Sequence, residues 1–592
     1  MKPLLIYDGR CGFCRIWIDY WKRLTGDRID YAPSQEVGAQ YPQIPREAFA
    51  EAVQLVRPDG SVASGALAVF ETLGCEYVYN SSSLIARTTD WAYRFIAHHR
   101  SAFYQVTRFT FGTRIEPARF AITRWVFLRL LAAVYAVAFA SLAVQVSGLL
   151  GTRGISPAHD FFEAVAQSLG SIRYFAVPSV FWLNSSDLVL QITCWAGVGL
   201  AVFLFIGRLE RLLLALLYVL YLSFSLAGQE FLSFQWDALL LEAGFLAIFF
   251  GRTLSTQRTI AWLFRWLVFR LYFLSGIVKL TSQDPTWHGL TALDFHYYTQ
   301  PLPTLLAWYA DKLPEWFQRF STFSVLAIEI GAPFLIFAPR RMRMFGAGVL
   351  LSLQTLIFAT GNYTFFNVLT AALTLFLFDD QALRGLVWKP RRVAIETLAS
   401  TRAGRAGAAV LTMLILPLGF ARLFETLVDL PEPLRSVARY TTPFQIANSY
   451  GLFRVMTTSR LEIVIEGSDD GEQWKAYEFP YKPGDVNRAP RWAAPHQPRL
   501  DWQMWFAALG DYRSNPWFLG LAARLLEGSP PVLALLEKNP FPDHPPRYIR
   551  ALSYDYKFST WQEHRQTGAW WHREPHGEYL PPIGLRTTAE IR

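Results

Sequence analysis

Two cysteines near the start of the chain, Cys11 and Cys14, have the spacing of a thiol–disulfide active site. They follow the apolar run 4–7 and open a helical pattern. The dipole and free N–H groups of a helix N-terminus favour thiolate, so Cys11 is the expected nucleophile and Cys14 the residue that resolves a mixed disulfide. Half of a zinc site is one alternative, but the chain has only four cysteines and no second pair to complete it. A purely structural pair is the other alternative.

A second group of candidate residues consists of charged side chains within long apolar segments. A charge in hydrocarbon is costly unless it faces a protein interior or a wet cavity. One hypothesis joins four of these charges in a catalytic or binding centre, where desolvation would favour the neutral form of a lysine and suit it as a base. The alternative is ion pairing between helices, with snorkelling at span ends. The four residues are Glu242, Arg270, Lys279 and Glu329.

Other residue types argue against two classes of function. His288 and His296 match no standard metal spacing, and Pro575 breaks the helix that would align His572 with His576. We therefore expect no metal and no cofactor. The net charge is +9, but the basic residues cluster between apolar segments and form no stripe interleaved with aromatic residues. We therefore expect no nucleic-acid partner.

The thiol pair must be positioned by a small α/β domain, residues 1–105. A strand at 4–7 precedes Cys11, and a helix at 14–24 follows with its apolar residues on one face. This order of strand, Cys-x-x-Cys, helix and strand is typical of a thioredoxin-like fold. The remaining expected elements are strands at 29–31 and 52–56 and a helix at 66–73.

The buried charges must be positioned by a polytopic α-helical membrane domain, residues 118–428. Hydrophobic residues make up 52% of the chain and charged residues 17%, against about 25% in ordinary soluble domains. Two long loops, 147–186 and 280–320, have interfacial or re-entrant character. Nine segments are long enough to span a bilayer: 125–146, 187–206, 210–228, 237–251, 260–279, 321–338, 344–360, 363–378 and 408–428.

Basic residues predict the orientation of these spans. Arg208 and Arg211 follow the second span, Arg252 the fourth and Arg340 the sixth, whereas the loop 229–236 has no basic residue. Because cytoplasmic loops are enriched in lysine and arginine, the N-terminus is expected inside and the C-terminus outside. The first apolar run is too short for a signal peptide, so the thiol pair is expected in the cytoplasm.

The last region, residues 430–592, is expected to be an extracytoplasmic α+β domain. Its many tryptophans suggest an apolar face that binds partly folded client proteins. The alternative is that these tryptophans lie in the core or face the bilayer. The expected elements are strands at 461–466, 474–479 and 548–556 and helices at 501–509 and 517–526.

The string Tyr7-Asp8-Gly9-Arg10-Cys11-Gly12-Phe13-Cys14 resembles the DCC family of thiol-disulfide oxidoreductases over residues 1–100. The resemblance implies a redox pair, with Tyr7, Asp8 and Gly9 as supporting residues. Oxidoreductase activity and redox sensing both remain open.

A segment of the membrane region, 272–280, has the sequence Tyr-Phe-Leu-Ser-Gly-Ile-Val-Lys-Leu and is followed by Trp287 and Gly289. It resembles a motif of vitamin K-dependent γ-carboxylases and their bacterial relatives. In those enzymes the matching lysine is the catalytic base, which implies that role for Lys279. Shared architecture without this activity is the alternative.

Longer strings in 444–458, 466–474 and 494–505, with Trp236-Asp237 and Asn362-Tyr363, resemble lipase maturation factors over 118–580. The resemblance implies an integral membrane factor that helps lipases fold after translocation, which eukaryotic members do in the endoplasmic reticulum. The DCC-like segment at the start is an arrangement typical of bacteria. We therefore expect a bacterial inner membrane, with the C-terminal domain in the periplasm.

Three functional hypotheses follow. The first is a maturation factor for secreted clients, lipases foremost, surrounded by membrane lipid, whose thiol pair acts on a cytoplasmic thiol partner or senses redox state. The second is an integral membrane enzyme of the carboxylase-like kind that uses Lys279. The third is a relay of electrons across the membrane, which ranks last because only Cys194 lies within a span.

Overall fold

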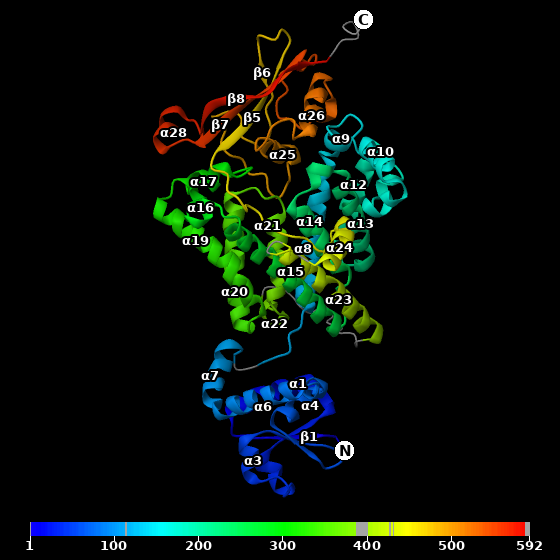
Figure 1. Ribbon diagram of the computed structural model, residues 1–592, viewed down its shortest axis with the longest axis vertical. Helices are drawn as coiled ribbons and strands as arrows, with labels where there is room; N and C mark the ends of the chain where they lie inside the picture. Colours follow the sequence, from blue (N-terminus) through cyan, green and yellow to red (C-terminus); the bar gives the residue numbers. More distant parts are fainter. Residues whose placement is uncertain (1, 113–114, 386–400, 426–427, 430, 586–592) are drawn as a thin grey trace. The chain divides into compact units, whose positions relative to one another are not determined.

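The computed structural model describes residues 2–112, 115–385, 401–425, 428–429 and 431–585. The chain forms two compact units (Figure 1). The first contains residues up to 119 together with 337–345, and the second contains 120–336 and 346–592.

The first unit is a four-stranded sheet with helices on both faces. Its main elements are β1 (Leu4–Tyr7), α1 (Gly12–Thr25), β2 (Asp30–Pro33), α3 (Arg46–Glu51), β3 (Gln54–Val56), β4 (Val62–Ser64) and α4 (Gly65–Leu73). The strand order is β2-β1-β3-β4, with β1 parallel to β2 and antiparallel to β3. Successive residues of β1 face opposite sides: Leu5 packs with Ile18 and Ala68, and Ile6 packs with Phe49. The expected α/β domain is confirmed.

Two further helices, α6 (Ser83–His98) and α7 (Arg100–Thr110), complete the first unit. α6 packs on α4, and α7 packs on α1. The hydroxyl of Ser82 caps α6 by accepting from the N–H of Leu84 at 3.2 Å. Neither helix was predicted from the sequence, because α6 buries no residue completely and its apolar stripe is interrupted by polar side chains.

Seven helices among the described residues are long and apolar enough to cross a bilayer, so the chain is an integral membrane protein. They are α8 (Ala121–Ala143), α12 (Asp187–Ile206), α13 (Glu210–Ala227), α15 (Leu254–Thr281), α19 (Glu315–Gly331), α20 (Arg340–Thr360) and α23 (Arg402–Phe424).

The expected count of nine spans is not confirmed. The segments 237–251 and 363–378 correspond to α14 (Gln235–Ile248), with 14 residues, and α21 (Phe366–Thr374), with 9 residues. A helix of that first length covers about 21 Å, which is less than the roughly 30 Å of a hydrocarbon core. Both helices pack among longer ones, α14 against α13 and α15, and α21 against α8 and α15.

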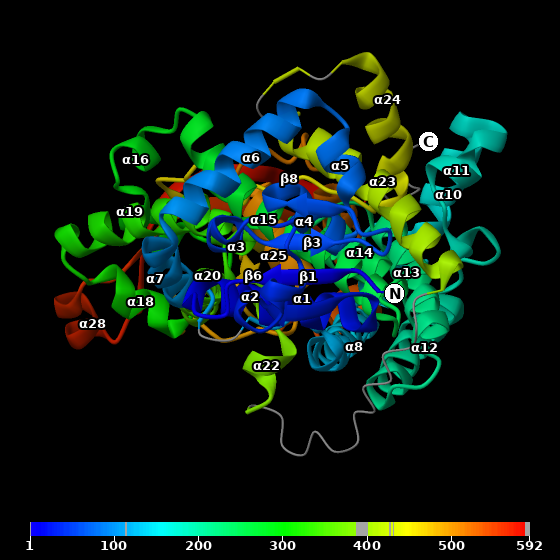
Figure 2. The same ribbon diagram turned by 90° about the horizontal axis from the view of Figure 1, so that it is seen from below.

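The bundle is organised around α8 and α15. α8 is apolar on nearly all sides, as expected of a helix in the middle of a core, and packs against α12 and α21. α15 packs against α19 and α23. Figures 1 and 2 show α12 and α13 side by side at one edge and α19 at the opposite edge. Phe203 of α12 and Trp316 and Phe320 of α19 are exposed, as expected of side chains that face lipid.

Residues beyond 430 form an antiparallel sheet with accompanying helices, within the same compact unit as the membrane helices. The strand order is β6-β5-β7-β8. Most strands and helices lie close to the expected positions. The return strand expected at 474–479 is only two residues long. Strand β8 was not expected, because prolines interrupt its pattern. The elements are β5 (Arg460–Ser468), β6 (Lys475–Ala476), α25 (Arg499–Ala507), α26 (Pro516–Leu526), β7 (Tyr548–Phe558) and β8 (Trp571–Gly584).

The loop 280–320 packs against this sheet. It contains α17 (Ala292–Thr299) and α18 (Leu305–Asp311). Tyr297 and Trp308 from these helices share one buried cluster with Tyr556 of β7 and Trp571 of β8. The loop is therefore part of the scaffold that joins the sheet to the membrane helices.

Candidate functional site

The thiol pair lies where β1 ends and α1 begins. Cys11 is the N-cap of α1, and its Sγ accepts a hydrogen bond from the backbone N–H of Cys14 at 3.3 Å. Gln35 fixes the preceding turn: its Oε1 accepts from the N–H of Gly9 at 3.0 Å, and its Nε2 donates to Asp8 at 2.9 Å. A Cβ at Gly9 would lie 2.9 Å from that Oε1, so a larger residue would displace Gln35.

The three residues expected to support the thiols shape the turn and the core. Asp8 also accepts from the N–H of Arg10 at 2.9 Å. Tyr7 is buried in the core, with the ammonium of Lys22 5.7 Å from the centre of its ring. Contacts of this kind position Cys11 without taking part in thiol chemistry.

The two thiols differ in charge. The hydrogen bond from the Cys14 side chain, assisted by backbone N–H groups and the charge of Arg100, lowers the pKa of Cys11 to about 6. The pKa of Cys14 is raised, first by its hydrogen bond to Cys11 and then by burial. At neutral pH the arrangement holds a half-buried Cys11 thiolate beside a protonated Cys14, which is the state a disulfide-exchanging pair needs.

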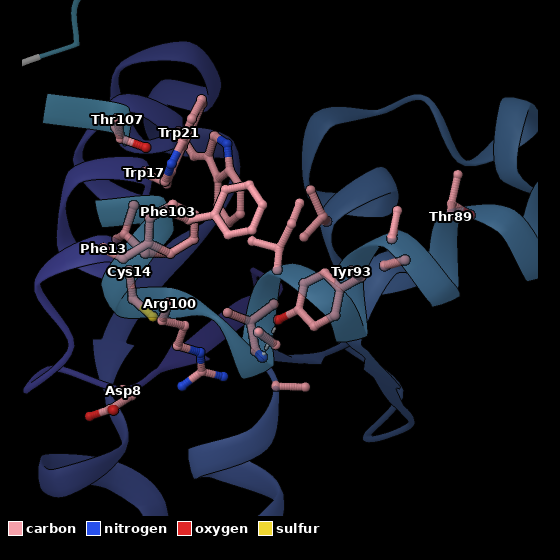
Figure 3. Close-up of a pocket in the computed structure, with 18 of the residues that line it drawn as sticks. Asp8, Phe13, Cys14, Trp17, Trp21, Thr89, Tyr93, Arg100, Phe103 and Thr107 are labelled. Carbon is pink, nitrogen blue, oxygen red and sulfur yellow. Dashed lines mark hydrogen bonds between the residues drawn. The ribbon is translucent and has the colours of Figure 1, made fainter. Parts of the chain in front are cut away.

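A half-open cavity of about 480 Å³ lies beside the thiol pair and is lined mainly by α1, α4, α6 and α7. Figure 3 shows Cys14, Arg100 and Asp8 at one end of it and the rings of Trp17 and Trp21 toward the other. Nothing in the sequence pattern indicated this cavity. Its outer wall belongs to α6 and α7, the two helices that were not predicted.

The four charges in the membrane region form two separate pairs, not one centre. Arg270 pairs with Glu242, and Lys279 pairs with Glu329 at 2.6 Å. Arg270 and Lys279 stand nine residues apart on α15, which is about 13 Å along a helix axis.

The Arg270–Glu242 pair holds a distant segment of the chain. Glu242 accepts from the N–H of Asn448 at 2.9 Å and from the hydroxyl of Tyr450 at 2.9 Å, and Arg270 donates to the carbonyl of Asn448 at 2.9 Å. Both carboxylate oxygens of Glu242 accept hydrogen bonds, whereas the Nε of Arg270 is buried and finds no partner among the described residues. The pair therefore anchors the segment 448–450 on α14 and α15.

The Lys279–Glu329 pair lies in an aromatic surrounding. The Nζ of Lys279 also donates to the carbonyl of Ser275 at 3.0 Å and lies 5.2 Å from the centre of the Trp287 ring. An ammonium that donates to a carboxylate has no free lone pair, so a base role would require the pair to open. His296 is partly exposed, but its Nδ1 is buried and finds no hydrogen-bond partner in the described part of the chain.

Two further anchors were missed by sequence reasoning. Arg499 of α25 makes a bidentate ion pair with Asp237 of α14, at 2.9 and 3.0 Å. Asn362 accepts from the N–H groups of Ala493 and Ala494 at 2.7 and 3.0 Å. The polar residues within otherwise apolar strings were the available signal, but the sequence gave no indication of their partners.

Four of the eight tryptophans of the last region lie in its core, whereas Trp492 and Trp561 are exposed. Trp502, Trp505, Trp517 and Trp571 are each less than a tenth exposed. These four rings therefore do not form an apolar face for clients, and the alternative of a core position holds for them.

No cluster of three or more potential metal ligands occurs in the residues that the structure describes.

Comparison with known proteins relates the three regions to families. The lipase maturation factor transmembrane domain matches residues 122–385, the lipase maturation factor C-terminal domain matches 446–581, and the DCC1-like thiol-disulfide oxidoreductase matches 5–106.

Relatives resemble the chain over most of its length. Lipase maturation factor 2 of Gallus gallus is 36% identical over 79% of this chain and 82% of its own. The human lipase maturation factor 2 is 35% identical over 78% of this chain and 83% of its own. Lipase maturation factor 1 of Bos taurus is 36% identical over 79% and 90%, respectively. No solved structure matches the chain significantly.

Proposed function

Since this chain belongs to the lipase maturation factor family, we propose that it is an integral membrane factor that assists the folding of exported lipases or similar secreted proteins. The contacts between the C-terminal sheet region and the membrane helices support this role. Arg499–Asp237, Asn448–Glu242 and Ala493–Asn362 tie that region to the bundle at three places. A client that emerges from the membrane would then meet a surface held at a fixed place.

A deletion strain tests this function. Wild type is expected to restore the specific activity of secreted lipases without changing the amount of lipase made, because folding and not synthesis is assisted. Arg565→Gln, at an exposed residue of the C-terminal region, serves as a matched control and should complement fully. Unchanged specific activity throughout the secretome in the deletion strain would overturn the proposal.

The first unit is proposed to exchange disulfides with a cytoplasmic thiol partner or to sense redox state. The Cys11 thiolate attacks one sulfur of a partner disulfide, and the other sulfur leaves as a thiolate that takes a proton. Cys14 then loses its proton and attacks the Cys11 sulfur, which releases the second partner thiolate and leaves a Cys11–Cys14 disulfide. Cys11→Ser should abolish exchange with a small disulfide, whereas Cys75→Ser, outside the pair, should not.

The orientation is proposed from the basic residues at span ends, with the N-terminus in the cytoplasm and the C-terminal region in the periplasm of a bacterial inner membrane. Reporter fusions at residues 115 and 440 test it. A periplasmic reporter at 115 would reverse the orientation and with it the compartment of the thiol pair.

A second candidate function is an integral membrane enzyme that uses Lys279 as a base. The buried pair with Glu329 beside Trp287 and the unpartnered Nδ1 of His296 favour it. Lys279→Arg keeps the ion pair but cannot act as a base, so it separates the roles. Function retained by Lys279→Arg and lost by Lys279→Ala would indicate a structural pair, whereas loss in both, with folding intact, would indicate catalysis.

An electron relay across the membrane is the least supported of the three hypotheses. Cys194 is fully buried in α12, and among the described residues no other cysteine lies in the second unit. Cys194→Ala should therefore leave every activity unchanged.

A further inference from the structure

The cavity in the first unit has the size and lining of a small-molecule site. Such sites measure roughly 300–1,000 Å³ and are mostly apolar with a few polar groups. The cavity of about 480 Å³ falls in this range, and flat rings dominate its wall. Aromatic side chains favour stacking and edge contacts with another ring. The rings include those of Phe13, Trp17, Trp21, Phe49, Tyr93 and Phe103.

One side chain in the wall keeps hydrogen-bond donors available to a ligand. Arg100 donates one N–H to the carbonyl of Ala50 at 2.7 Å and another to that of Glu51 at 2.5 Å, which holds its guanidinium at the end of the cavity shown in Figure 3. Arginine has five N–H groups, so further ones can bind a ligand oxygen.

Several other polar groups of the wall already have partners. The hydroxyl of Tyr93 accepts from the N–H of Val53 at 3.0 Å, and that of Thr110 donates to its own helix at 2.8 Å. The Oδ1 of Asp8 accepts from Gln35 and from the N–H of Arg10. The cavity therefore suits an apolar ring with a carbonyl oxygen that accepts from Arg100.

A redox-active sulfur completes the wall. Cys14 lines the cavity, whereas Cys11 is not among its lining residues. One thiol of the pair is thus placed for exchange with a protein partner and the other for contact with a bound molecule. No second thiol pair exists in the chain to accept the electrons.

We propose that the cavity binds the headgroup of a lipid-soluble quinone and that the thiol pair reduces it. One carbonyl oxygen would accept from Arg100, with the ring against the aromatic wall and the tail leaving through the opening. The Cys14 S–H bond breaks and a Cys11–Cys14 bond forms as two electrons pass to the quinone. The thiol proton and one proton from solvent form the two O–H bonds of the hydroquinone. The inference rests on the redox role proposed for the first unit and names its electron acceptor.

The proposal is tested with the full chain in lipid nanodiscs. The protein is first reduced, the reductant is then removed, and the reaction is followed in the absence of oxygen. The probe is a para-benzoquinone with every ring position substituted and a short alkyl tail, so that thiols cannot form stable ring adducts. The expected result is one hydroquinone, measured by absorbance, for each Cys11–Cys14 disulfide, measured by mass spectrometry. Reduced wild-type protein that leaves the quinone unchanged would overturn the proposal.

Variants separate the cavity from the thiol chemistry. Ala97→Phe fills the cavity beside α6 and should slow quinone reduction at least tenfold, while exchange with a small disulfide continues at the wild-type rate. Trp17→Phe shrinks one aromatic ring of the wall and should weaken quinone binding several-fold. Arg87→Gln, at an exposed position of the same helix, is the control.

The outcomes distinguish this proposal from the lipase function. If Ala97→Phe unfolds the unit, Ala92→Phe is used in its place. A folded variant with a filled cavity that still reduces the quinone at the wild-type rate would overturn the proposed quinone site. Loss of quinone reduction with normal lipase maturation would leave the proposed membrane function standing. Failure of lipase maturation would not affect the measurement on purified protein.

Discussion

At the scale of residues, the environment of α1 divides charge unequally between two identical side chains. Cys11 sits at the helix N-terminus, where it accepts from the N–H of Cys14, and Arg100 adds a positive charge nearby. Cys14 lies one turn deeper and faces the cavity. The nucleophile and the resolving thiol are thus distinguished by position alone.

The reactivity of Cys11 should follow the protonation of that thiol. Because its pKa is lowered to about 6, alkylation should be fast at neutral pH and slow as the pH falls below 6. Cys14→Ala removes the hydrogen bond that contributes most, so the midpoint should rise toward the ordinary thiol value of about 8.5. Peptide-resolved mass spectrometry after brief iodoacetamide labelling measures both, with Cys75 as internal reference. A wild-type midpoint near 8.5 would contradict the assignment.

Buried ion pairs are the other feature decided at single residues. Arg499 and Asp237 are almost completely buried and far apart in sequence. A buried pair adds little net stability, but removal of one partner leaves a charge without compensation.

Arg499→Met should therefore lower the free energy of unfolding by about 3–5 kcal/mol, as expected when one partner of a buried pair is removed. The double variant Arg499→Met with Asp237→Leu should recover much of this loss, because no uncompensated charge remains. Thermal unfolding in nanodiscs compares these variants with Arg565→Gln. A single variant as stable as wild type would show that Asp237 is solvated and not buried.

At the scale of elements, close contact between α8 and α12 depends on one glycine. A Cβ at Gly197 would lie 2.5 Å from the ring of Phe139, whereas a Cβ at Gly199, half a turn away, would meet nothing within 4 Å. Small residues allow membrane helices to approach closely and gain dispersion contacts.

Gly197→Ala should therefore destabilise the bundle by about 1–3 kcal/mol, as overpacking does. Gly199→Ala on the same helix should be neutral or slightly stabilising, because alanine has the higher helix propensity. Thermal unfolding of the two variants side by side checks the difference. Equal effects would mean that α8 and α12 do not touch at this point.

At the scale of the whole molecule, the chain combines two units with separate cores. Under the orientation proposed from the basic residues at span ends, the thiol chemistry and the proposed client binding belong to different compartments.

A chain that lacks residues 1–112 should insert and fold, because the second unit has its own core and no anchor of its sheet comes from the removed segment. Its melting temperature should stay within a few degrees of the full chain. Quinone reduction should be lost, because the thiol pair is removed. Maturation of lipases that does not depend on the thiol pair should persist. A truncated chain that fails to fold would show that the two units depend on each other.

Local patterns in the sequence determined the element types and several residues of interest. The Cys-x-x-Cys spacing after an apolar strand predicted a thiolate at a helix N-terminus, since that chemistry depends on neighbours within four residues. The long apolar segments predicted membrane helices, because length and hydropathy suffice for insertion. Strand β8 and the helices α6 and α7 escaped prediction, since prolines or mixed faces hide a burial that depends on distant partners.

Only the tertiary structure decided which distant residues meet. It resolved the proposed four-charge centre into two pairs on separate turns of α15, joined Arg499 to Asp237 and buried four of the tryptophans considered for client binding. It also created the cavity behind Cys14. These outcomes depend on packing between elements that lie far apart in the sequence. Because a one-dimensional pattern does not specify which elements meet, it cannot identify the partner of a buried charge or ring.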